Sequence, residues 1–404
     1  MNNQKTFDIY EKITHFTLYD IIISLLVLSS LSFYDVKLVF LGIQFIAFAM
    51  TFAQIFIRKS LPKHVLAYIC WLFVFSFYGY ASSLWISDRN TTSVLVTLSV
   101  IQVGLIAVCI MLYVHNHPER FIKLINIFIL SACIISIRFF IDVPISAWGK
   151  EARFSEDTLF GGNIPAMIMS FSVVYLFYYV FIKHLNDKRK IAIFLISLFT
   201  LITLLMGTKK GLLIITIGVV FLWITHTKNP VKLLTRTVIS IAICVIVYSA
   251  IMRIPVLYGS IGYRIDGMIK GFQSGQGDAS TNARIKFISD ALRVFNENKL
   301  LGVGQDGYRY ENIYEPVYSH NNYVEILANL GILGFITYYS IFVVTLVKAF
   351  KKWRNNLLPI TTIIIMLIID VSMVSYSCEM SYVLFALCLS FVQLKENTNV
   401  EKNI

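Results

Sequence analysis

The chain has 404 residues, of which 57% are hydrophobic and 14% are charged, and its formal net charge at pH 7 is +12. A mean hydropathy of +0.71 excludes a separate water-soluble domain and is typical of a polytopic membrane protein. The positive charge does not by itself indicate a nucleic-acid partner, because basic residues also mark one side of a membrane protein.

Apolar runs of about 15 to 22 residues recur along the whole chain, close to the length that an α-helix needs to cross a bilayer. Backbone groups in hydrocarbon have no water partner, so these runs must be helical. We therefore predict an all-α polytopic membrane protein with about twelve transmembrane helices, in a single integral membrane domain over residues 1–404. The predicted spans are 16–33, 36–57, 65–86, 93–114, 124–141, 162–182, 191–206, 212–226, 237–252, 323–347, 357–376 and 380–394.

Basic residues are unevenly divided between the connections on the two sides. The connections that share a side with both termini are rich in lysine and arginine, as at Arg58 and Lys59. Cytoplasmic connections carry this excess, so both termini are predicted to be cytoplasmic. That topology places three segments outside: 142–161, the tight turn 207–211 and, between the ninth and tenth spans, the long segment 253–322.

Patterns typical of metal sites or disulfides are missing from the sequence. The six cysteines are scattered without a Cys-x-x-Cys pair, and the acidic residues of the outer segments form no Asp-x-Asp cluster. Neither a disulfide framework nor a zinc site is indicated, and we expect no metal and no other cofactor. Inside the spans, Asp20, Arg138 and Asp370 are expected to be paired or functional, because ionisable groups are costly there.

The predicted extracytoplasmic loop 253–322 contains one amphipathic stretch. Residues 282–295 favour a short helix, with Ser280 or Thr281 as its cap, and at 100° per residue one apolar stripe forms. Arg284 falls near the centre of that stripe, where a guanidinium group needs an anion; alternatively, its aliphatic stem snorkels to water. The stripe consists of Phe287, Ile288, Ala291, Leu292 and Phe295.

His320 is the only histidine of the seven that the predicted topology places outside. Imidazole suits a general base that takes a proton from a hydroxyl group; the alternative is an interfacial histidine bonded to a loop carbonyl. Tyrosines 308, 310, 314 and 318 precede it, either as a sugar-stacking surface or as an interfacial aromatic belt.

Basic residues in the three outer segments are candidates for binding an anion such as pyrophosphate. Arg153 lies in 142–161, Lys210 lies in the turn 207–211, and Arg264 and Arg284 both lie in 253–322, on the side where basic residues are otherwise sparse. Pyrophosphate needs several donors, and arginine forks suit it. Any single one of these residues is also compatible with a solvated loop position.

These residues occur in a pattern that resembles the bacterial O-antigen ligase and O-antigen/capsule polymerase superfamily. The resemblance is densest over 280–335, where Arg284 opens a helix, Gly302-Val303-Gly304 follows, and His320-Asn321 precedes Gly331-x-x-Gly334. Two weaker matches are Arg153 with the Phe160-Gly161-Gly162-Asn163 segment, and the turn 207–211, which has lysine at 210 where the family usually has arginine.

The resemblance implies a metal-independent glycosyltransferase that acts on a glycan carried by undecaprenyl pyrophosphate, at the outer face of the bacterial cytoplasmic (inner) membrane. It implies that His320 deprotonates or orients the acceptor hydroxyl and that Arg153, Lys210, Arg264 and Arg284 neutralise the pyrophosphate. Asn321 and Tyr318 are further candidates for substrate binding. A glycan acceptor, membrane lipid, a chain-length regulator and a flippase are the partners that it suggests.

The acceptor distinguishes two functions within this superfamily. A polymerase transfers the glycan to another lipid-linked repeat unit, and a ligase transfers it to lipid A core; the segment Tyr323 to Gly331 favours the polymerase. A polytopic transporter or flippase is the alternative from another class, and it would need charges at mid-membrane rather than an essential His320.

Overall fold

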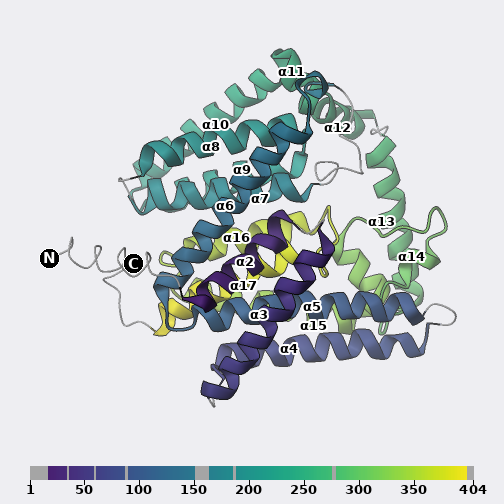
Figure 1. The fold of residues 1–404 in the computed structure, drawn as a ribbon. Helices are drawn as coiled ribbons and strands as arrows, with labels where there is room; N and C mark the ends of the chain where they lie inside the picture. The colour runs from purple at the N-terminus through teal and green to yellow at the C-terminus, as the bar shows by residue number, and fades with distance from the viewer. Residues whose placement is uncertain are drawn as a thin grey trace.

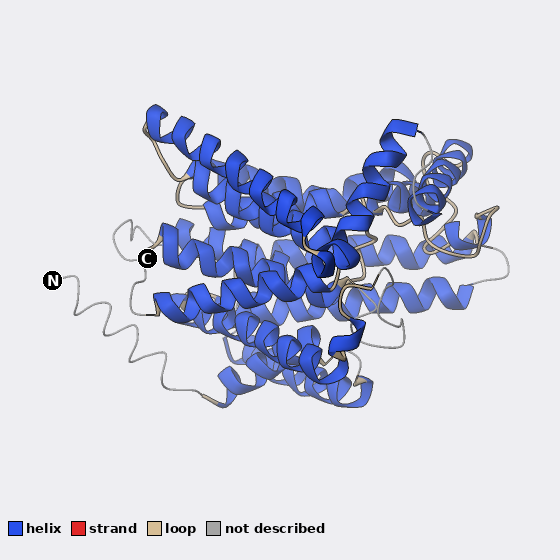
Figure 2. Cartoon of the chain, turned by 90° about the horizontal axis from the view of Figure 1, so that it is seen from above, coloured by secondary structure: helices blue, strands red, loops and turns tan. Residues whose placement is uncertain are grey.

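The computed structural model describes residues 17–33, 36–58, 61–86, 90–150, 163–184, 188–274 and 279–397, and these ranges contain helices and loops but no β-strand (Figure 2). The predicted all-α fold is therefore confirmed. Figure 1 shows the order of the helices along the chain. The main ones are α2 (Leu18–Ser32), α3 (Lys37–Arg58), α4 (Lys63–Ala81), α5 (Asn90–Val114), α6 (Pro118–Asp142), α7 (Ile164–Phe177), α8 (Arg189–Leu205), α9 (Lys209–Thr225), α10 (Pro230–Arg253), α15 (Asn322–Lys351), α16 (Leu357–Ile369) and α17 (Glu379–Asn397).

Each of the predicted spans coincides with one of these helices, and the protein is a multi-pass membrane protein. Seven helices in the described ranges are long and apolar enough to cross a bilayer: α3 to α7, α10 and α15, with η4 (Tyr178–Ile182) extending α7. Helices α2, α16 and α17 are apolar but shorter, so the total of twelve crossings stays a prediction. The eleventh run ends early, because α16 stops at Ile369 and a turn begins at Asp370 rather than at 376.

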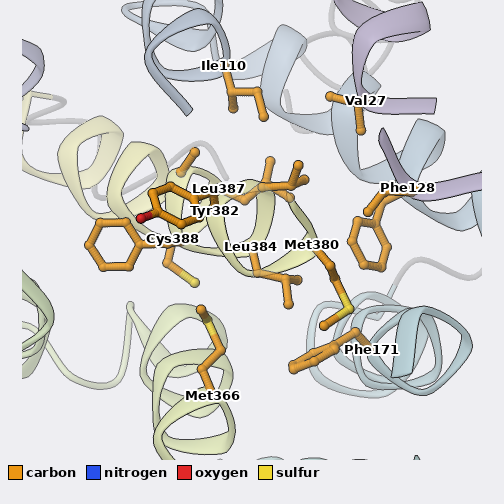
Figure 3. Packing of buried hydrophobic residues seen from close by; sticks show 14 of the residues in the cluster. Val27, Ile110, Phe128, Phe171, Met366, Met380, Tyr382, Leu384, Leu387 and Cys388 are labelled. Carbon is orange, nitrogen blue, oxygen red and sulfur yellow. The ribbon is translucent and has the colours of Figure 1, made fainter. Parts of the chain in front are cut away.

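Helix α17 is the centre of the hydrophobic core (Figure 3). Its residues Leu384, Leu387 and Cys388 are almost completely buried. Side chains from five other helices surround it, which explains why an apolar helix this short is stable here: packing against neighbours, rather than length, holds it in place. These side chains include Val27 of α2, Ile110 of α5, Phe128 of α6, Phe171 of α7 and Met366 of α16.

The three ionisable residues expected inside spans all have partners. Asp20, near the start of α2, accepts a hydrogen bond from Lys123 Nζ at 3.1 Å, close to the start of α6. At the other end of the same helix pair, Arg138 Nη1 donates to the carbonyl of Ser32 at 2.9 Å. Asp370 is bound by residues of α15 and of the turn after α16, and it is described with the site below.

The segment 253–322 contains more helix than the sequence predicted. It includes α11 (Pro255–Leu257), η5 (Tyr258–Gly262), α12 (Tyr263–Ser274), α13 (Ala279–Glu297) and α14 (Tyr308–Glu311). At the right of Figure 1, α13 and α14 lie beside α15. The predicted short helix is therefore α13, which begins at Ala279, so Ser280 and Thr281 lie inside it and neither is its cap.

Candidate active site at the start of helix α15

His320 lies two residues before α15, and its ring lies beside two other aromatic side chains. The ring centroids of His320 and Tyr318 are 4.3 Å apart, and the ring of Phe287 on α13 is stacked at 6.1 Å with an interplanar angle of 27°. The backbone of His320 has φ +61°, in the left-handed region that non-glycine residues seldom adopt. The surrounding contacts must therefore maintain a conformation that the isolated chain would avoid.

Arg284 precedes Phe287 by three residues on α13, so the two side chains project from the same face of the helix. Arg284 is half-buried, and within the described ranges it makes no hydrogen bond and no ion pair. Its guanidinium group is thus available to a ligand on the side of α13 that carries the His320 ring.

The predicted apolar stripe of α13 is partly wrong. Phe287 and Ala291 are buried as expected, but Leu292 is 40% exposed, and Asp290 and Val294 are buried in its place. The contacting elements decide this rotation: Tyr308 and the start of α15 lie against the side of the helix that carries Ala291 and Val294.

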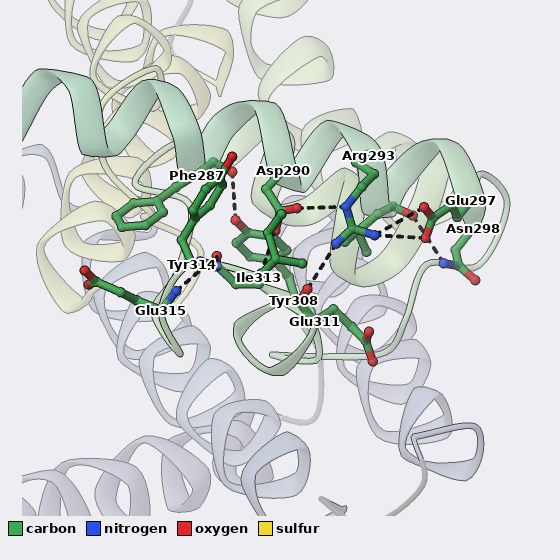
Figure 4. A network of polar contacts seen from close by, with 12 residues as sticks. Phe287, Asp290, Arg293, Glu297, Asn298, Tyr308, Glu311, Ile313, Tyr314 and Glu315 are labelled. Atoms are coloured by element: carbon green, nitrogen blue, oxygen red, sulfur yellow. Dashed lines mark hydrogen bonds and ion pairs between the residues drawn. The ribbon is translucent and has the colours of Figure 1, made fainter.

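Arg293 has a structural environment that differs from that of Arg284 (Figure 4). Its Nε donates to Asp290 Oδ1 at 2.8 Å, and its Nη1 donates to both carboxylate oxygens of Glu297. Its Nη2 also donates to the carbonyl of Glu311 at 3.1 Å, and these acidic partners raise the pKa of Arg293. Arg293 therefore ties α13 to α14, and it has few donors left for a substrate.

The four tyrosines before His320 do not form one stacking surface. Tyr308 is completely buried, and its hydroxyl donates to the carbonyl of Phe287 at 2.7 Å. The hydroxyl of Tyr310 is hydrogen-bonded to Thr92 at 2.9 Å. Tyr314 and Tyr318 are exposed, and Tyr318, which touches His320, is the one that can face a sugar bound there.

Asn321 is the N-cap of α15. Its side-chain oxygen accepts hydrogen bonds from the backbone N–H groups of Tyr323 and Val324, which satisfies donors that a helix start leaves open. This side chain is 8% exposed. Its oxygen is therefore committed to the helix, whereas substrate binding by Asn321 stays a prediction.

The Gly-x-Gly turn and Gly331 have a shared structural role. Helix α15 is interrupted at Gly331, which has φ +61° and ψ −166°. The carbonyls freed there accept from the turn, with Gly304 N to Asn329 O at 2.7 Å and Val303 N to Ala328 O at 3.0 Å. A Cβ atom on Gly302 would lie 2.4 Å from the Asn329 carbonyl, so only glycine permits this approach.

A polar clamp joins the start of α15 to the turn after α16. Asn322 Nδ2 donates to Asp370 Oδ2 at 3.1 Å, and its Oδ1 accepts from the backbone N–H of Ser375 at 2.9 Å. Tyr339 and Ser375 donate their hydroxyls to the same carboxylate. Asp370 thus fixes Asn322, two residues after His320, in place. These hydrogen bonds account for a carboxylate at this position without a ligand at mid-membrane.

The other predicted basic residues form a second group at the α8–α9 turn. Arg264 Nη1 donates to the carbonyl of Gly207 at 2.7 Å, and its Nε donates to the hydroxyl of Tyr263 at 3.2 Å. Lys210 is half-buried in the first turn of α9, three residues after Gly207. Arg153 lies outside the described residues, as do Phe160, Gly161 and Gly162.

Two buried acidic residues near His320, Glu325 and Asp306, were not identified from the sequence as parts of the site. Glu325 is completely buried and accepts from the backbone N–H of Ser319 at 2.6 Å. Asp306 is 3% exposed and lies beside Arg309 at 3.4 Å. Burial raises the pKa of Asp306, although Arg309 opposes that rise. A carboxylate in the first turn of a predicted span was the signal for Glu325, because such groups need a partner.

No three His, Cys, Asp or Glu side chains among the described residues are arranged to hold a metal ion. The prediction of a metal-independent reaction is not tested by this observation.

Comparison with known proteins finds a family match for the segment that contains this site. A family model described as O-antigen ligase matches residues 191–339, a range that contains Lys210, Arg264, Arg284 and His320 but not Arg153. No curated protein matches the chain. The resemblance seen in the sequence is thereby confirmed over residues 191–339: this part of the multi-pass membrane protein matches the O-antigen ligase family, in agreement with the O-antigen ligase and polymerase superfamily suspected from the sequence.

Proposed function

We propose that the protein is a glycosyltransferase that moves a glycan from undecaprenyl pyrophosphate to a hydroxyl of another lipid-linked repeat unit, which makes it an O-antigen or capsule polymerase. The family match supports a glycosyltransferase of this superfamily. The observation that carries the proposal is the position of His320, stacked on Phe287 one turn of α13 from Arg284, whose guanidinium group makes no ion pair within the described ranges.

In the proposed reaction, the acceptor hydroxyl oxygen attacks the anomeric carbon of the donor glycan. A new glycosidic bond forms as the bond from that carbon to the pyrophosphate oxygen breaks. His320 takes the proton of the acceptor hydroxyl, so that the attacking oxygen is more nucleophilic as the bond forms. The lipid pyrophosphate leaves with its electron pair.

Negative charge grows on the pyrophosphate as it leaves, and the arginine and lysine side chains would stabilise it more than they stabilise the ground state. Among these residues, Arg284 is the nearest in sequence to His320 and to Phe287, whose ring stacks on that of His320. Arg264 retains N–H donors beyond the two that hold it to Gly207 and Tyr263, because a guanidinium group has five. Lys210 would add positive charge but no bidentate fork. Arg153 would add both positive charge and a bidentate fork.

This function requires that the 253–322 segment faces the outer side of the cytoplasmic membrane, with both termini in the cytoplasm. The excess of lysine and arginine at the other end of the helices supports that orientation. A chain-length regulator and a flippase would then be functional partners, and the reaction would proceed without a metal.

A ligase is the second candidate, and the description of the matching family favours it. The two functions differ only in the acceptor. Purified protein supplied with lipid-linked repeat units alone should yield a ladder of longer glycans if it is a polymerase. Product that forms only after lipid A core is added would identify a ligase.

Substitution of His320 tests the mechanism. We expect His320→Ala to lower the rate of glycan transfer by at least about a hundredfold, the size of a lost general base, while the protein stays in the membrane. His117→Ala is the matched control, because His117 is 40% exposed in the α5–α6 connection at the opposite end of the bundle, where it pairs with Glu119. Unchanged transfer by His320→Ala would contradict the assignment of the base.

A further inference from the structure

A closed series of contacts connects His320 to α13 through the interior of the protein. Glu325, completely buried in the first turn of α15, accepts hydrogen bonds at both carboxylate oxygens. Its Oε2 accepts from the backbone N–H of Ser319 at 2.6 Å, and its Oε1 accepts from Asn329 Nδ2 at 3.1 Å. Ser319 is the residue before His320, so one side of this carboxylate holds the backbone that carries the imidazole.

The other side of the carboxylate leads back to the same imidazole. Asn329 Oδ1 accepts from the backbone N–H of Tyr308 at 2.8 Å. The hydroxyl of Tyr308 donates to the carbonyl of Phe287 at 2.7 Å (Figure 4), and the ring of Phe287 stacks on His320. The series therefore begins and ends at His320, and it passes through the helix that carries Arg284.

We infer that Glu325 is a positioning residue, which holds the His320 loop and α13 in the mutual arrangement that the transfer reaction requires. The inference rests on the proposed function, in which His320 and Arg284 act on the same substrate. Glu325 itself is completely buried and is not a catalytic residue.

The chemistry of the contacts explains why a carboxylate is needed at this position. Both partners of Glu325, a backbone N–H and an amide NH₂, are donors only, so both of its oxygens must accept. A glutamine in its place would put its own NH₂ group against one of the two donors. His320 at φ +61° depends on its surroundings to keep that conformation, and the Ser319–Glu325 bond lies directly beside it.

The same pair of residues permits a test by exchange. In Glu325→Gln, the NH₂ group of the glutamine faces the NH₂ group of Asn329, so two donors meet. In Asn329→Asp, a second carboxylate faces Glu325, so two acceptors meet. Either change breaks the hydrogen bond between the two side chains. In the double variant Glu325→Gln/Asn329→Asp, the glutamine NH₂ donates to the aspartate, so a bond reforms with its direction reversed. In all three variants, the backbone N–H of Ser319 can still donate to residue 325, and the backbone N–H of Tyr308 can still donate to residue 329.

We expect each single variant to lower kcat by about tenfold to a hundredfold, the effect of a small displacement of catalytic groups, with the KM for the acceptor within about twofold of the unchanged protein. The double variant should recover kcat to within about fivefold. Rates are measured per folded molecule, with the folded fraction determined by size-exclusion chromatography in detergent. Glu315→Gln is the control, because Glu315 is an exposed carboxylate in the same loop, and it should leave kcat unchanged.

Single variants with normal kcat, or a double variant no more active than Asn329→Asp alone, would overturn the inference. If Glu325→Gln does not fold, the comparison of Asn329→Asp with the double variant still decides the question. The proposed function fails separately: it fails if His320→Ala is active, whereas an inactive His320→Ala together with normal Glu325 and Asn329 variants removes only the role of Glu325.

Discussion

At the scale of single residues, the two arginines of α13 differ in what surrounds them. Arg293 is occupied by Asp290, Glu297 and the carbonyl of Glu311. Arg284 has no such bonds within the described part of the chain. Charge and helix are the same in both cases, so neighbouring side chains alone separate a structural arginine from one that is available to an anion.

We predict that Arg284→Lys lowers glycan transfer about tenfold or more, because lysine keeps the charge but loses the bidentate fork. Arg293→Lys should affect transfer less. Arg293→Ala should instead reduce the free energy of unfolding by about 1 kcal/mol, since it leaves the buried carboxylate of Asp290 without its ion pair.

Transfer rates and melting temperatures in detergent, measured on the same preparations, check both parts of this prediction. Equal losses of transfer in Arg284→Lys and Arg293→Lys would mean that α13 does not present Arg284 to the substrate.

At the scale of elements, the interruption of α15 places the candidate site. A helix that continued through Gly331 would use the carbonyls of Ala328 and Asn329 internally, and the Gly-x-Gly turn would have nothing to bind. The glycines that resemble the family motif therefore act through the backbone: they let the turn approach α15 closely enough to exchange hydrogen bonds with it. His320 and Glu325 lie on the short piece of α15 and its entry loop that this junction holds.

We predict that Gly331→Ala destabilises the protein by about 3 kcal/mol or more and abolishes transfer. Its backbone conformation is close to glycine-only, and a Cβ atom there would lie 2.3 Å from the carbonyl oxygen of Leu300. Thermal unfolding in detergent measures the loss.

Gly42→Ala is the matched control for this prediction. Gly42 lies within α3, and a Cβ atom there meets nothing within 4 Å, so stability should stay the same or rise by up to about 1 kcal/mol, because alanine favours helix more than glycine does. Similar behaviour of the two variants would show that the break in α15 is not required.

At the scale of the whole molecule, contacts from the 253–322 segment converge on one end of the helices. Gln305 N donates to Ser82 Oγ beyond the end of α4. Arg264 binds the turn between α8 and α9, and the N–H of Gly149, beyond the end of α6, donates to Ser260 Oγ. Asp20, Arg120 and Lys123 gather at the opposite end of α2 and α6. The molecule therefore has one end that carries the candidate site and another that carries paired and solvated basic groups.

We predict the orientation of these two ends from that division of charge. In a variant without the exposed Cys70 and Cys244, a cysteine at Glu315 should react with a membrane-impermeant maleimide in intact spheroplasts. A cysteine at Lys228, exposed in the turn between α9 and α10, should react only after permeabilisation. The reverse pattern would place the candidate site in the cytosol and remove the basis for glycan assembly.

The sequence alone determined the class of the protein, the positions of its apolar helices and the resemblance to the superfamily that the family match over residues 191–339 bears out. Long apolar runs in a bilayer must be helical, because hydrocarbon offers the backbone no hydrogen-bond partner. The resemblance to the superfamily depends on the spacing between His320 and the glycines, which can be read directly along the chain. The sequence also placed Arg284 near the centre of the predicted apolar stripe of α13. It did not predict the buried face of α13, where Asp290 and Val294 replace Leu292, because helical periodicity alone does not say which neighbours a helix will meet.

Only the tertiary structure decided which polar residues are committed to the fold. Tyr308 is buried beneath α13, Asn321 caps α15, Asp370 clamps Asn322, and Glu325 joins Ser319 to Asn329. Hydrogen-bond partners far apart in the chain set these roles, and no pattern along the sequence records them. The physical reason is that a buried donor or acceptor must be satisfied by whatever lies within about 3 Å of it, which depends on the packing of the whole bundle.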